Sequence, residues 1–494
     1  MFENIKKEIQ DNRPVYFLLS IILALAAFVR VYRTDVILQF FYDQGRDALH
    51  IWDLIHKGDF FLIGPTTGIA GIFRGPAYYY LITPFYFFGG GNPVWPANFL
   101  ALSTVFAIAF AYFLGFKFRD RSAGIIAAIL ASFSFYLMLS SRWLSNPTPM
   151  FLLSMLFIFS LYKIMNGYKN YWILLSLVSG LSLFHFGSSG EFFYFPAIFI
   201  FTLWQRKNFP SWKILLASAF VFLLTVSPLV IFDFKNNHLL ANNISSFLFK
   251  KESFKTDFLT VLYDRLDFYE GVFWGKIFPS GSRWEVYLKF ATGILFLLNA
   301  DALLKNKYFK LVSLVLLSVT VGLLFFQGNE GNIYDYYLTG YYLIFIIFLS
   351  LVLREISTSF IGKLFLLFFF FIFLKTNLPI INSNINDGAD GPQTIAFKPQ
   401  VEAINWIYQD AGDRQFNVDV YVPPVIPYAY DYLLAWKQNP NNSSEQVDLL
   451  YTLYEVDPPH PERLEAWLAR QKGIGEIEET KQFSGIYVQR RKRI

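Results

Sequence analysis

Long apolar stretches recur along most of the chain and are separated by short polar connections. They lie near residues 14–32, 93–115, 122–140, 148–165, 171–186, 191–204, 213–232, 285–301, 308–326, 337–353 and 360–378. A helix needs about 20 mostly apolar residues to cross roughly 30 Å of hydrocarbon. The pattern therefore predicts an α-helical polytopic membrane protein with about eleven transmembrane helices. The stretches at 171–186 and 191–204 are short, which indicates broken helices or helices around a cavity.

The basic residues of the short connections predict the orientation. One set of alternate connections holds Lys117, Arg119, Arg121, Lys163, Lys169, Arg206, Lys207, Lys213, Lys305, Lys307, Lys310, Arg354 and Lys363. The other set holds only Arg142. Connections rich in Lys and Arg remain cytoplasmic, so the N-terminus is expected in the cytoplasm and two long connections, about 33–92 and 233–284, outside. The first helix is expected to stay as an anchor, because Arg30 and Arg33 follow it where a cleavage site would need small residues.

The composition changes to that of a soluble domain from about residue 379. The pattern predicts helices at 401–410, 428–436 and 461–471, strands at 416–422 and 449–455, and a hairpin at 474–489. We expect a transmembrane domain over 1–378 and a small C-terminal soluble α/β domain over 379–494, which eleven crossings place outside. Within the first long connection, 45–55 fits an amphipathic helix lying on the membrane.

Composition supports this class and excludes several functions. Hydrophobic residues make up 54% of the chain and charged residues 16%, against roughly 25% charged in soluble domains. The net charge of +5 is spread over helix ends, so we expect no nucleic-acid partner. The absence of cysteine excludes disulfides and thiolate catalysis. The five histidines are scattered and no phosphate-binding loop motif is present, so we expect no metal and no cofactor.

The first segment with candidate chemistry is Tyr42-Asp43-Gln44-Gly45-Arg46-Asp47, shortly after the first apolar stretch. If it opens a helix, Asp43, Arg46 and Asp47 share one face. Asp43 could then take a proton from an attacking hydroxyl, while Arg46 binds an anionic group through its planar guanidinium. The plainer alternative is a capping Asp with a solvated ion pair.

A second candidate segment is Arg74-Gly75-Pro76-Ala77-Tyr78-Tyr79-Tyr80. A cation in a Gly-Pro turn beside tyrosines suits the phosphate of a membrane lipid. Tyrosines at membrane interfaces are also common without any ligand.

Other outer segments supply weaker candidates. Arg142 would be a second phosphate contact or a snorkelling side chain at the interface. Asn146, in the same segment as Arg142, would line a substrate pocket. His185 and Glu191 would line it as well, since ionisable groups at membrane depth usually face a cavity. The candidates for the far side of that pocket are Glu330, Tyr334, Asp335 and Tyr337.

The order and spacing of these segments resemble the membrane glycosyltransferases of the GT-C superfamily. The likeness is strongest to the branch of the dolichyl-phosphate-mannose protein mannosyltransferases and the lipid A aminoarabinose transferase. Asp43-Gln44-Gly45-Arg46 is similar to that branch's Asp-Glu-x-Arg motif, with Gln44 in place of the second acid. Arg74-Gly75-Pro76-Ala77-Tyr78-Tyr79 is similar to its Lys-Pro-Pro-Leu-x-Tyr motif, with Arg for Lys and Gly for the first Pro.

The resemblance implies an inverting glycosyltransferase on the extracytoplasmic face. It would move a sugar from a polyprenyl-phosphate-linked donor to a hydroxyl of a protein, lipid or glycan acceptor. Asp43 would be the catalytic base, and Arg46, Arg74 and Arg142 would bind the donor phosphate. The pocket would contain Asp47, Tyr78, Tyr79, Asn146, His185, Glu191, Tyr334, Asp335 and Tyr337. The sugar, the acceptor and the oligomeric state stay open.

Two other classes fit parts of the pattern. A polytopic transporter or flippase for a lipid-linked saccharide also has many spans, although the paired, interrupted halves typical of transporters are not visible. A membrane scaffold would use residues 379–494 as a binding module. In that segment Tyr428, Tyr430, Tyr432 and Trp436 would form either a sugar-stacking surface or a core.

Overall fold

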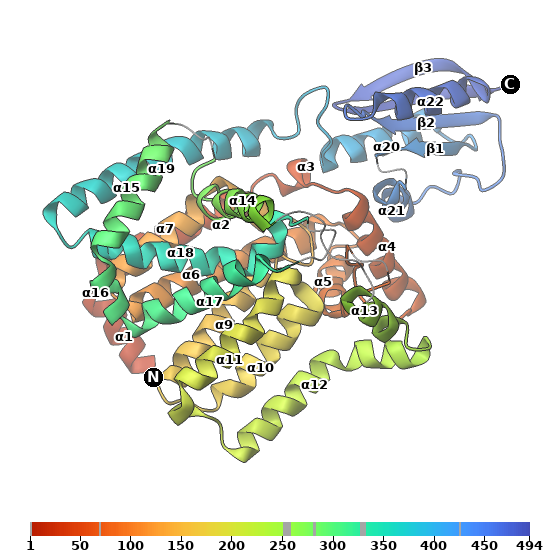
Figure 1. The fold of residues 1–494 in the computed structure, drawn as a ribbon. Coiled ribbons are helices and arrows are strands. Elements are labelled where there is room, and N and C mark those ends of the chain that lie inside the picture. The colour runs from red at the N-terminus through yellow and green to blue at the C-terminus, as the bar shows by residue number, and fades with distance from the viewer. Residues whose placement is uncertain (1, 69–70, 250–257, 280–282, 327–331, 424–425) are drawn as a thin grey trace.

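The computed structural model describes residues 2–68, 71–249, 258–279, 283–326, 332–423 and 426–494. A bundle of helices forms most of the molecule, and a small sheet with its own helices lies at one end (Figure 1). The first third of the chain forms α1 (Phe2–Asp11), α2 (Arg13–Val31), α3 (Thr34–Ile37), α4 (Tyr42–Lys57), α5 (Ala77–Phe88), α6 (Val94–Phe118), α7 (Arg121–Phe133), α8 (Phe135–Ser141) and α9 (Met150–Met165).

The remaining helices of the bundle follow in chain order. They are α10 (Tyr171–Leu181), α11 (Tyr194–Trp204), α12 (Trp212–Lys235), α13 (Leu239–Phe249), α14 (Phe258–Tyr269), α15 (Arg283–Leu298), α16 (Ala300–Lys305), α17 (Lys307–Leu323), α18 (Thr339–Ile356) and α19 (Phe360–Asp387). A π-helical turn, Ser182–Phe186, extends α10, and 3₁₀ turns Ser189–Phe193 and Asp335–Leu338 precede α11 and α18.

All the predicted apolar stretches coincide with helices, but the number of spans is not settled by their lengths. Within the described residues, five helices are long and apolar enough to cross a membrane: Arg13–Ile37, Val94–Phe118, Trp212–Lys235, Asp335–Ile356 and Phe360–Asp387. The pair α7 and α8, bent by 68°, would be a sixth. The count of eleven therefore stays a prediction.

The break between α7 and α8 is built from specific polar contacts. Ser134, which lies between them, caps α8 by accepting a hydrogen bond from Leu137 N. The buried Arg30 of α2 donates to the carbonyl oxygens of Ala131 and Ser132 at 2.9 and 3.1 Å. These bonds satisfy carbonyls that a continuous helix would have used, which makes a broken helix acceptable at membrane depth.

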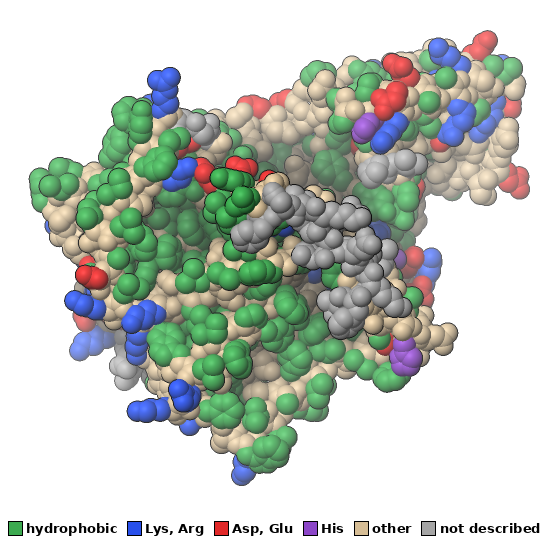
Figure 2. Space-filling model, viewed as in Figure 1, with side chains coloured by type: hydrophobic (Ala, Val, Ile, Leu, Met, Phe, Trp, Pro, Cys, Tyr) green, Lys and Arg blue, Asp and Glu red, His purple; other side chains and the backbone are tan. Residues whose placement is uncertain are grey.

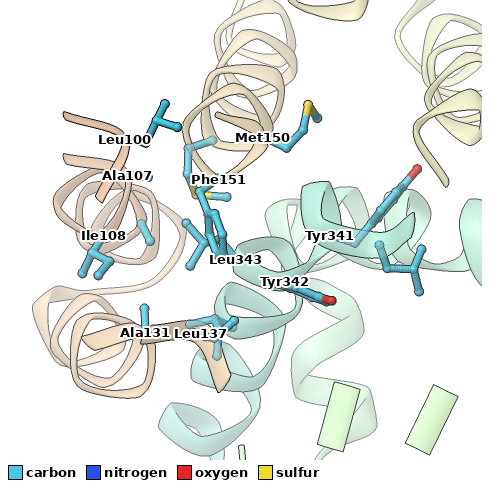
Figure 3. Packing of buried hydrophobic residues seen from close by; sticks show 14 of the residues in the cluster. Leu100, Ala107, Ile108, Ala131, Leu137, Met150, Phe151, Tyr341, Tyr342 and Leu343 are labelled. Carbon is cyan, nitrogen blue, oxygen red and sulfur yellow. The ribbon is translucent and has the colours of Figure 1, made fainter. Parts of the chain in front are cut away.

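Helix α18 forms the centre of the bundle. Its apolar window is 83% buried, whereas that of α12, at the edge of the bundle, is only 11% buried. Figure 3 shows buried side chains of α6, α7, α8 and α9 in the same core as Tyr341, Tyr342 and Leu343 of α18, among them Leu100, Ala107, Ile108, Ala131, Leu137, Met150 and Phe151. The helix thus provides the rigid frame for the segments at its N-terminal end.

The surface of the bundle agrees with an integral membrane protein. Figure 2 shows a wide band of hydrophobic side chains over the helices, with Lys and Arg gathered along the edge near the N-terminus. Phe199 of α11 and Phe220 and Leu223 of α12 are each more than 60% exposed. Exposed apolar surface of this extent needs lipid to cover it.

Residues 397–494, called the C-terminal unit below, form an α/β structure. It contains α20 (Phe397–Ala411), β1 (Asn417–Tyr421), α21 (Tyr428–Lys437), β2 (Leu449–Glu455), α22 (Pro461–Lys472), β3 (Gly475–Phe483) and β4 (Ile486–Arg493). The strand order is β1-β2-β4-β3, with β1 parallel to β2 and the other pairs antiparallel. Each predicted element of 401–489 is present, and β2 has the predicted bounds.

The structure differs from the sequence prediction at the domain border and within the first long connection. The predicted domain border at 378 falls inside α19, which continues through Pro379 to Asp387. The described part of the first long connection contains helices α3, α4 and α5, and the tyrosine run Tyr78–Tyr80 lies in α5. A proline is compatible with a helix when its neighbours satisfy the freed backbone groups, so the change in composition near residue 379 does not end α19.

Candidate active site

The segment Tyr42–Asp47 forms the first turn and a half of α4. Asp43 is exposed, with 56% of its side chain accessible, and its Oδ1 lies 2.8 Å from an Arg46 guanidinium nitrogen. Gln44 points the other way: its Oε1 accepts from Phe41 N at 3.1 Å and its Nε2 donates to Leu144 O at 3.3 Å. The residue that replaces the second acid of the similar motif therefore caps α4 and anchors it to the bundle.

Arg46 is held in place from several sides. Its Nε and a terminal nitrogen donate to Oδ1 of the buried Asp47 at 3.0 and 2.7 Å, and another nitrogen donates to Thr66 Oγ1 at 3.2 Å. Tyr79 of α5 donates its hydroxyl to the same Asp47 oxygen at 3.0 Å. Burial raises the pKa of Asp47 to about 6, although Arg46 opposes the shift. Asp47 and Tyr79 thus orient Arg46 and do not face solvent.

Arg74 lies shortly before α5, and its guanidinium makes no hydrogen bond or close ion pair with the described residues. Its backbone is fixed, because Arg74 N donates to Pro65 O at 3.1 Å and Gly64 N donates to Arg74 O at 2.7 Å. Within the described ranges, no oxygen accepts a hydrogen bond from the half-buried side chain. Burial lowers the pKa of Arg74, and Glu191, Tyr336 and Tyr337 act in the opposite direction. Such a cation is suited to an anionic ligand.

Tyr336 lies near both candidate segments, the start of α4 and the segment that contains Arg74. It interacts electrostatically with both Arg74 and Asp43, and its ring lies 5.6 Å from that of Tyr334 and 4.9 Å from that of Tyr337. The predicted far side of the pocket, Tyr334–Tyr337, therefore lies near Asp43 and Arg74. Glu330, predicted with it, lies outside the described residues.

Lys276 is a further cation on this far side that the sequence reasoning missed. It is 8% exposed, its Nζ lies 2.7 Å from Asp335 Oδ2, and it faces the rings of Tyr136 and Tyr342 at 4.9 and 5.4 Å. The sequence around Lys276, in the second long connection, does not indicate a site residue, because the residues that it contacts are distant in sequence.

Four predicted site residues make structural contacts. Arg142 donates to the carbonyls of Val29 and Tyr32, at the C-terminal end of α2, at 2.8 and 3.0 Å. Asn146 donates to Phe186 O at 3.1 Å. A phosphate role for Arg142 would require these carbonyl bonds to break, so the geometry does not support it.

His185 and Glu191 likewise join backbone segments. His185 Nδ1 accepts from Ala77 N at 3.2 Å and its Nε2 lies 2.7 Å from Thr225 O. Glu191 accepts from Ser188 N at 2.5 Å and from Gly340 N at 3.1 Å. It therefore lies at two helix N-termini, where a carboxylate is favoured. Tyr78, fully buried in α5, is also part of the core.

The described residues contain no group of three His, Asp or Glu side chains that could hold a metal ion. A cavity of about 230 Å³ lies on the other face of α4, lined by Ile51, Trp52, Ile55, His56, Tyr86, Phe87, Gly90, Gly91 and Tyr432. None of the predicted site residues lines it.

Comparison with solved structures defines the class. ArnT from Cupriavidus metallidurans superposes with a TM-score of 0.56 at 10% identity, over 97% of this chain and 98% of that one. The oligosaccharyltransferase of Archaeoglobus fulgidus gives a TM-score of 0.51 at 12% identity, over 96% of this chain and 72% of that one. No curated protein matches in sequence. The chain has the GT-C fold of these membrane glycosyltransferases.

A comparison with models of protein families shows which family part of the chain resembles. Residues 73–232 match the model of the family described as dolichyl-phosphate-mannose-protein mannosyltransferase. The match begins at Phe73, so it includes Arg74 and α5 but not Asp43 or Arg46. The resemblance to the GT-C superfamily, in the branch of ArnT and the protein mannosyltransferases, is confirmed.

Proposed function

We propose that this protein is an inverting glycosyltransferase that moves a sugar from a polyprenyl-phosphate-linked donor to an acceptor hydroxyl. The observation that carries the proposal is the pairing of the exposed Asp43 carboxylate with Arg46, near the guanidinium of Arg74, which has no hydrogen-bond partner among the described residues. A carboxylate base beside cations for a departing phosphate is what this reaction needs. The fold is compatible with it, and the ArnT structure was also obtained with undecaprenyl phosphate bound.

The proposed step is a single displacement at C1 of the sugar. The acceptor oxygen forms a bond to C1 while its proton passes to Asp43, and the bond from C1 to the phosphate oxygen breaks. The electron pair of that bond leaves with polyprenyl phosphate, whose negative charge Arg46 and Arg74 stabilise. Because attack and departure occur on opposite faces, the anomeric configuration inverts. Lys276 lies with Asp335 on the far side, where that carboxylate balances its charge.

No metal-dependent step is part of this proposal. The position of the second acid holds Gln44, whose amide is used in capping α4 and binding Leu144 O. The carboxylates of Asp43 and of the buried Asp47 are both paired with Arg46, so they make a poor metal site, since hard cations take several oxygen ligands.

We place the site and the C-terminal unit on the extracytoplasmic side. The Lys and Arg side chains gathered at the opposite edge, near the N-terminus (Figure 2), support this orientation. The polyprenyl tail would remain in lipid while its head group reaches the N-terminal end of α4. Membrane lipid, donor and a protein, lipid or glycan acceptor would be the partners.

The test uses purified protein in liposomes that contain a polyprenyl-phosphate sugar. We expect release of polyprenyl phosphate with the wild type and its loss, by at least 100-fold, in Asp43→Asn. Asp53→Asn is the matched control, because Asp53 lies on the same helix and pairs only with Lys57 among the described residues. Near-normal release by Asp43→Asn would refute the base assignment. Movement of intact donor across the bilayer without release would favour the transporter or flippase alternative.

A further inference from the structure

The helix that carries Asp43 and Arg46 is in backbone contact with the C-terminal unit. Gly45 of α4 lies against the start of α21, and an added Cβ atom there would overlap the backbone of Tyr428 and Ala429. The ring of Tyr42 lies 4.9 Å from that of Tyr428. A glycine is needed at this point because nothing larger fits between the two helices.

The segment directly before α4 is tied to α20. Leu38 O accepts from Phe397 N, the first residue of α20, at 3.0 Å, and Phe40 O accepts from Gln400 Nε2 at 2.9 Å. The Phe40 ring, fully buried, packs 5.8 Å from Phe397 and 5.7 Å from Tyr432. One residue, Phe41, separates this anchored segment from α4. The start of α4 is therefore fixed by contacts that the C-terminal unit provides.

A third contact holds the turn after α5. Tyr432 donates its hydroxyl to Gly91 O, and Trp436 Nε1 donates to Gly90 O at 2.8 Å. Helix α5 supplies Tyr79, which binds Asp47 and so supports Arg46. The C-terminal unit thus contacts both helices that build the site, and the hydrophobic core runs without interruption from Ala48 into α20 and α21.

We propose that the C-terminal unit positions the first turn of α4 for glycosyl transfer, and that Gly45 and Gln400 are positioning residues. The proposal rests on the function proposed above. Neither residue contacts the reacting atoms. Gly45 lets α21 approach α4, and Gln400 fixes the carbonyl of Phe40, so that together they set where Asp43 and Arg46 stand relative to Arg74.

The experiment compares Gly45→Ala with Gly293→Ala in the full-length protein. Gly293 lies in α15, and a Cβ atom added there meets nothing within 4 Å, so the control makes the same chemical change without displacing a neighbour. We expect Gly45→Ala to lower kcat by about 10- to 100-fold, since a misplacement of about 1 Å can cost about 100-fold. Affinity for polyprenyl phosphate should change less than threefold, and Gly293→Ala should keep wild-type kcat.

A structural readout runs in parallel. The chain has no cysteine, so cysteines introduced at the exposed Lys57 of α4 and Ser444 of the C-terminal unit can carry spin labels without competition. We expect Gly45→Ala to shift or broaden the distance between the labels. Gln400→Leu removes the bond to Phe40 without adding bulk, so it should lower kcat less and leave the thermal unfolding midpoint close to that of the wild type.

Three results would overturn the proposal. They are wild-type kcat in Gly45→Ala, an unchanged label distance in a variant whose kcat has fallen, or equal losses of kcat and donor affinity. An inactive wild type would instead refute the proposed function. The label distances would then still decide whether Gly45 sets the approach of α21 to α4.

Discussion

Glu455 of β2 is a buried carboxyl group at the junction between the C-terminal unit and the segment before α4. It is 6% exposed, and Tyr430 donates its hydroxyl to Glu455 Oε1 at 2.8 Å. The same oxygen lies 3.5 Å from Nε2 of Gln400, which binds Phe40 O. Burial raises the pKa of Glu455 from 4.5 to about 7, so its ionisation and the stability of the fold are linked.

The sign and size of this linkage follow from the shift. The pKa of this carboxyl group is higher in the folded state than in the unfolded state. The protein therefore loses stability as the pH rises from about 4.5 to about 7, and no further loss occurs above that range. Each pKa unit corresponds to about 1.4 kcal/mol, so the full cost is about 3 kcal/mol. Glu455→Gln cannot ionise and keeps an oxygen for Tyr430. The variant should therefore be more stable than the wild type at pH 8.5 by up to about 3 kcal/mol.

The assay is thermal unfolding followed by tryptophan fluorescence at pH 5.0 and pH 8.5. We expect the gap between the midpoints of Glu455→Gln and the wild type to be small at pH 5.0 and to grow by several degrees at pH 8.5. Glu445→Gln, at an exposed position of the same unit, serves as control and should show no such change. A gap of equal size at both pH values would refute the reasoning.

Three further predictions concern the candidate site. Arg74→Ala should weaken binding of polyprenyl phosphate at least tenfold in a direct titration, and unchanged affinity would contradict the phosphate role. Arg142→Ala should lower the unfolding midpoint, because the hydrogen bonds of Arg142 to the carbonyls at the end of α2 are lost. The affinity for polyprenyl phosphate should change less than threefold, and a tenfold loss would show that Arg142 binds the phosphate. Because the pKa of Asp47 is raised to about 6, it protonates and loosens Arg46 as the pH falls through that value. Wild-type kcat/KM should therefore drop below pH 6. The Asp47→Asn variant should have lower activity at every pH but no drop near pH 6. If the drop persists in this variant, a group other than Asp47 causes it.

The sequence predicted those parts of the structure whose signals are local. The strand Leu449–Glu455 is rich in Leu and Tyr and has its predicted bounds, and the hairpin predicted at 474–489 turns at Ser484-Gly485. The spacing of Asp43, Arg46 and Asp47 predicted a shared face, and both ion pairs are present. Each of these features depends on residues within a few positions of one another, which is why they could be recognised in a single sequence.

The remaining features depend on contacts between distant segments. Nothing near Gly45 indicates that Ala429 lies against it, and nothing near Lys276 indicates Asp335. The tyrosines of α21 show the same limit. Tyr430 and Tyr432 are buried, as the core interpretation holds, whereas Tyr428 reaches the ring of Tyr42 beside Asp43.

His185 and Glu191 were singled out because ionisable groups at membrane depth are costly. Backbone amides and a backbone carbonyl form hydrogen bonds with both side chains. These contacts cannot be recognised from the residue pattern.

Arg30 of α2 and Arg142, which follows α8 and binds the C-terminal end of α2, affect how an anion would approach. Arg30 and Arg142 are 1% and 8% exposed, and their described partners are carbonyl oxygens. A carbonyl satisfies the hydrogen bonds of a guanidinium but does not cancel its charge, so the field of both cations extends beyond the bundle. A low-dielectric surrounding screens such a field weakly, and positive potential near a binding site raises the rate of encounter with anions. On the function proposed above, a phosphate diffusing in the bilayer plane would therefore be drawn to this end of the protein before it touched any side chain.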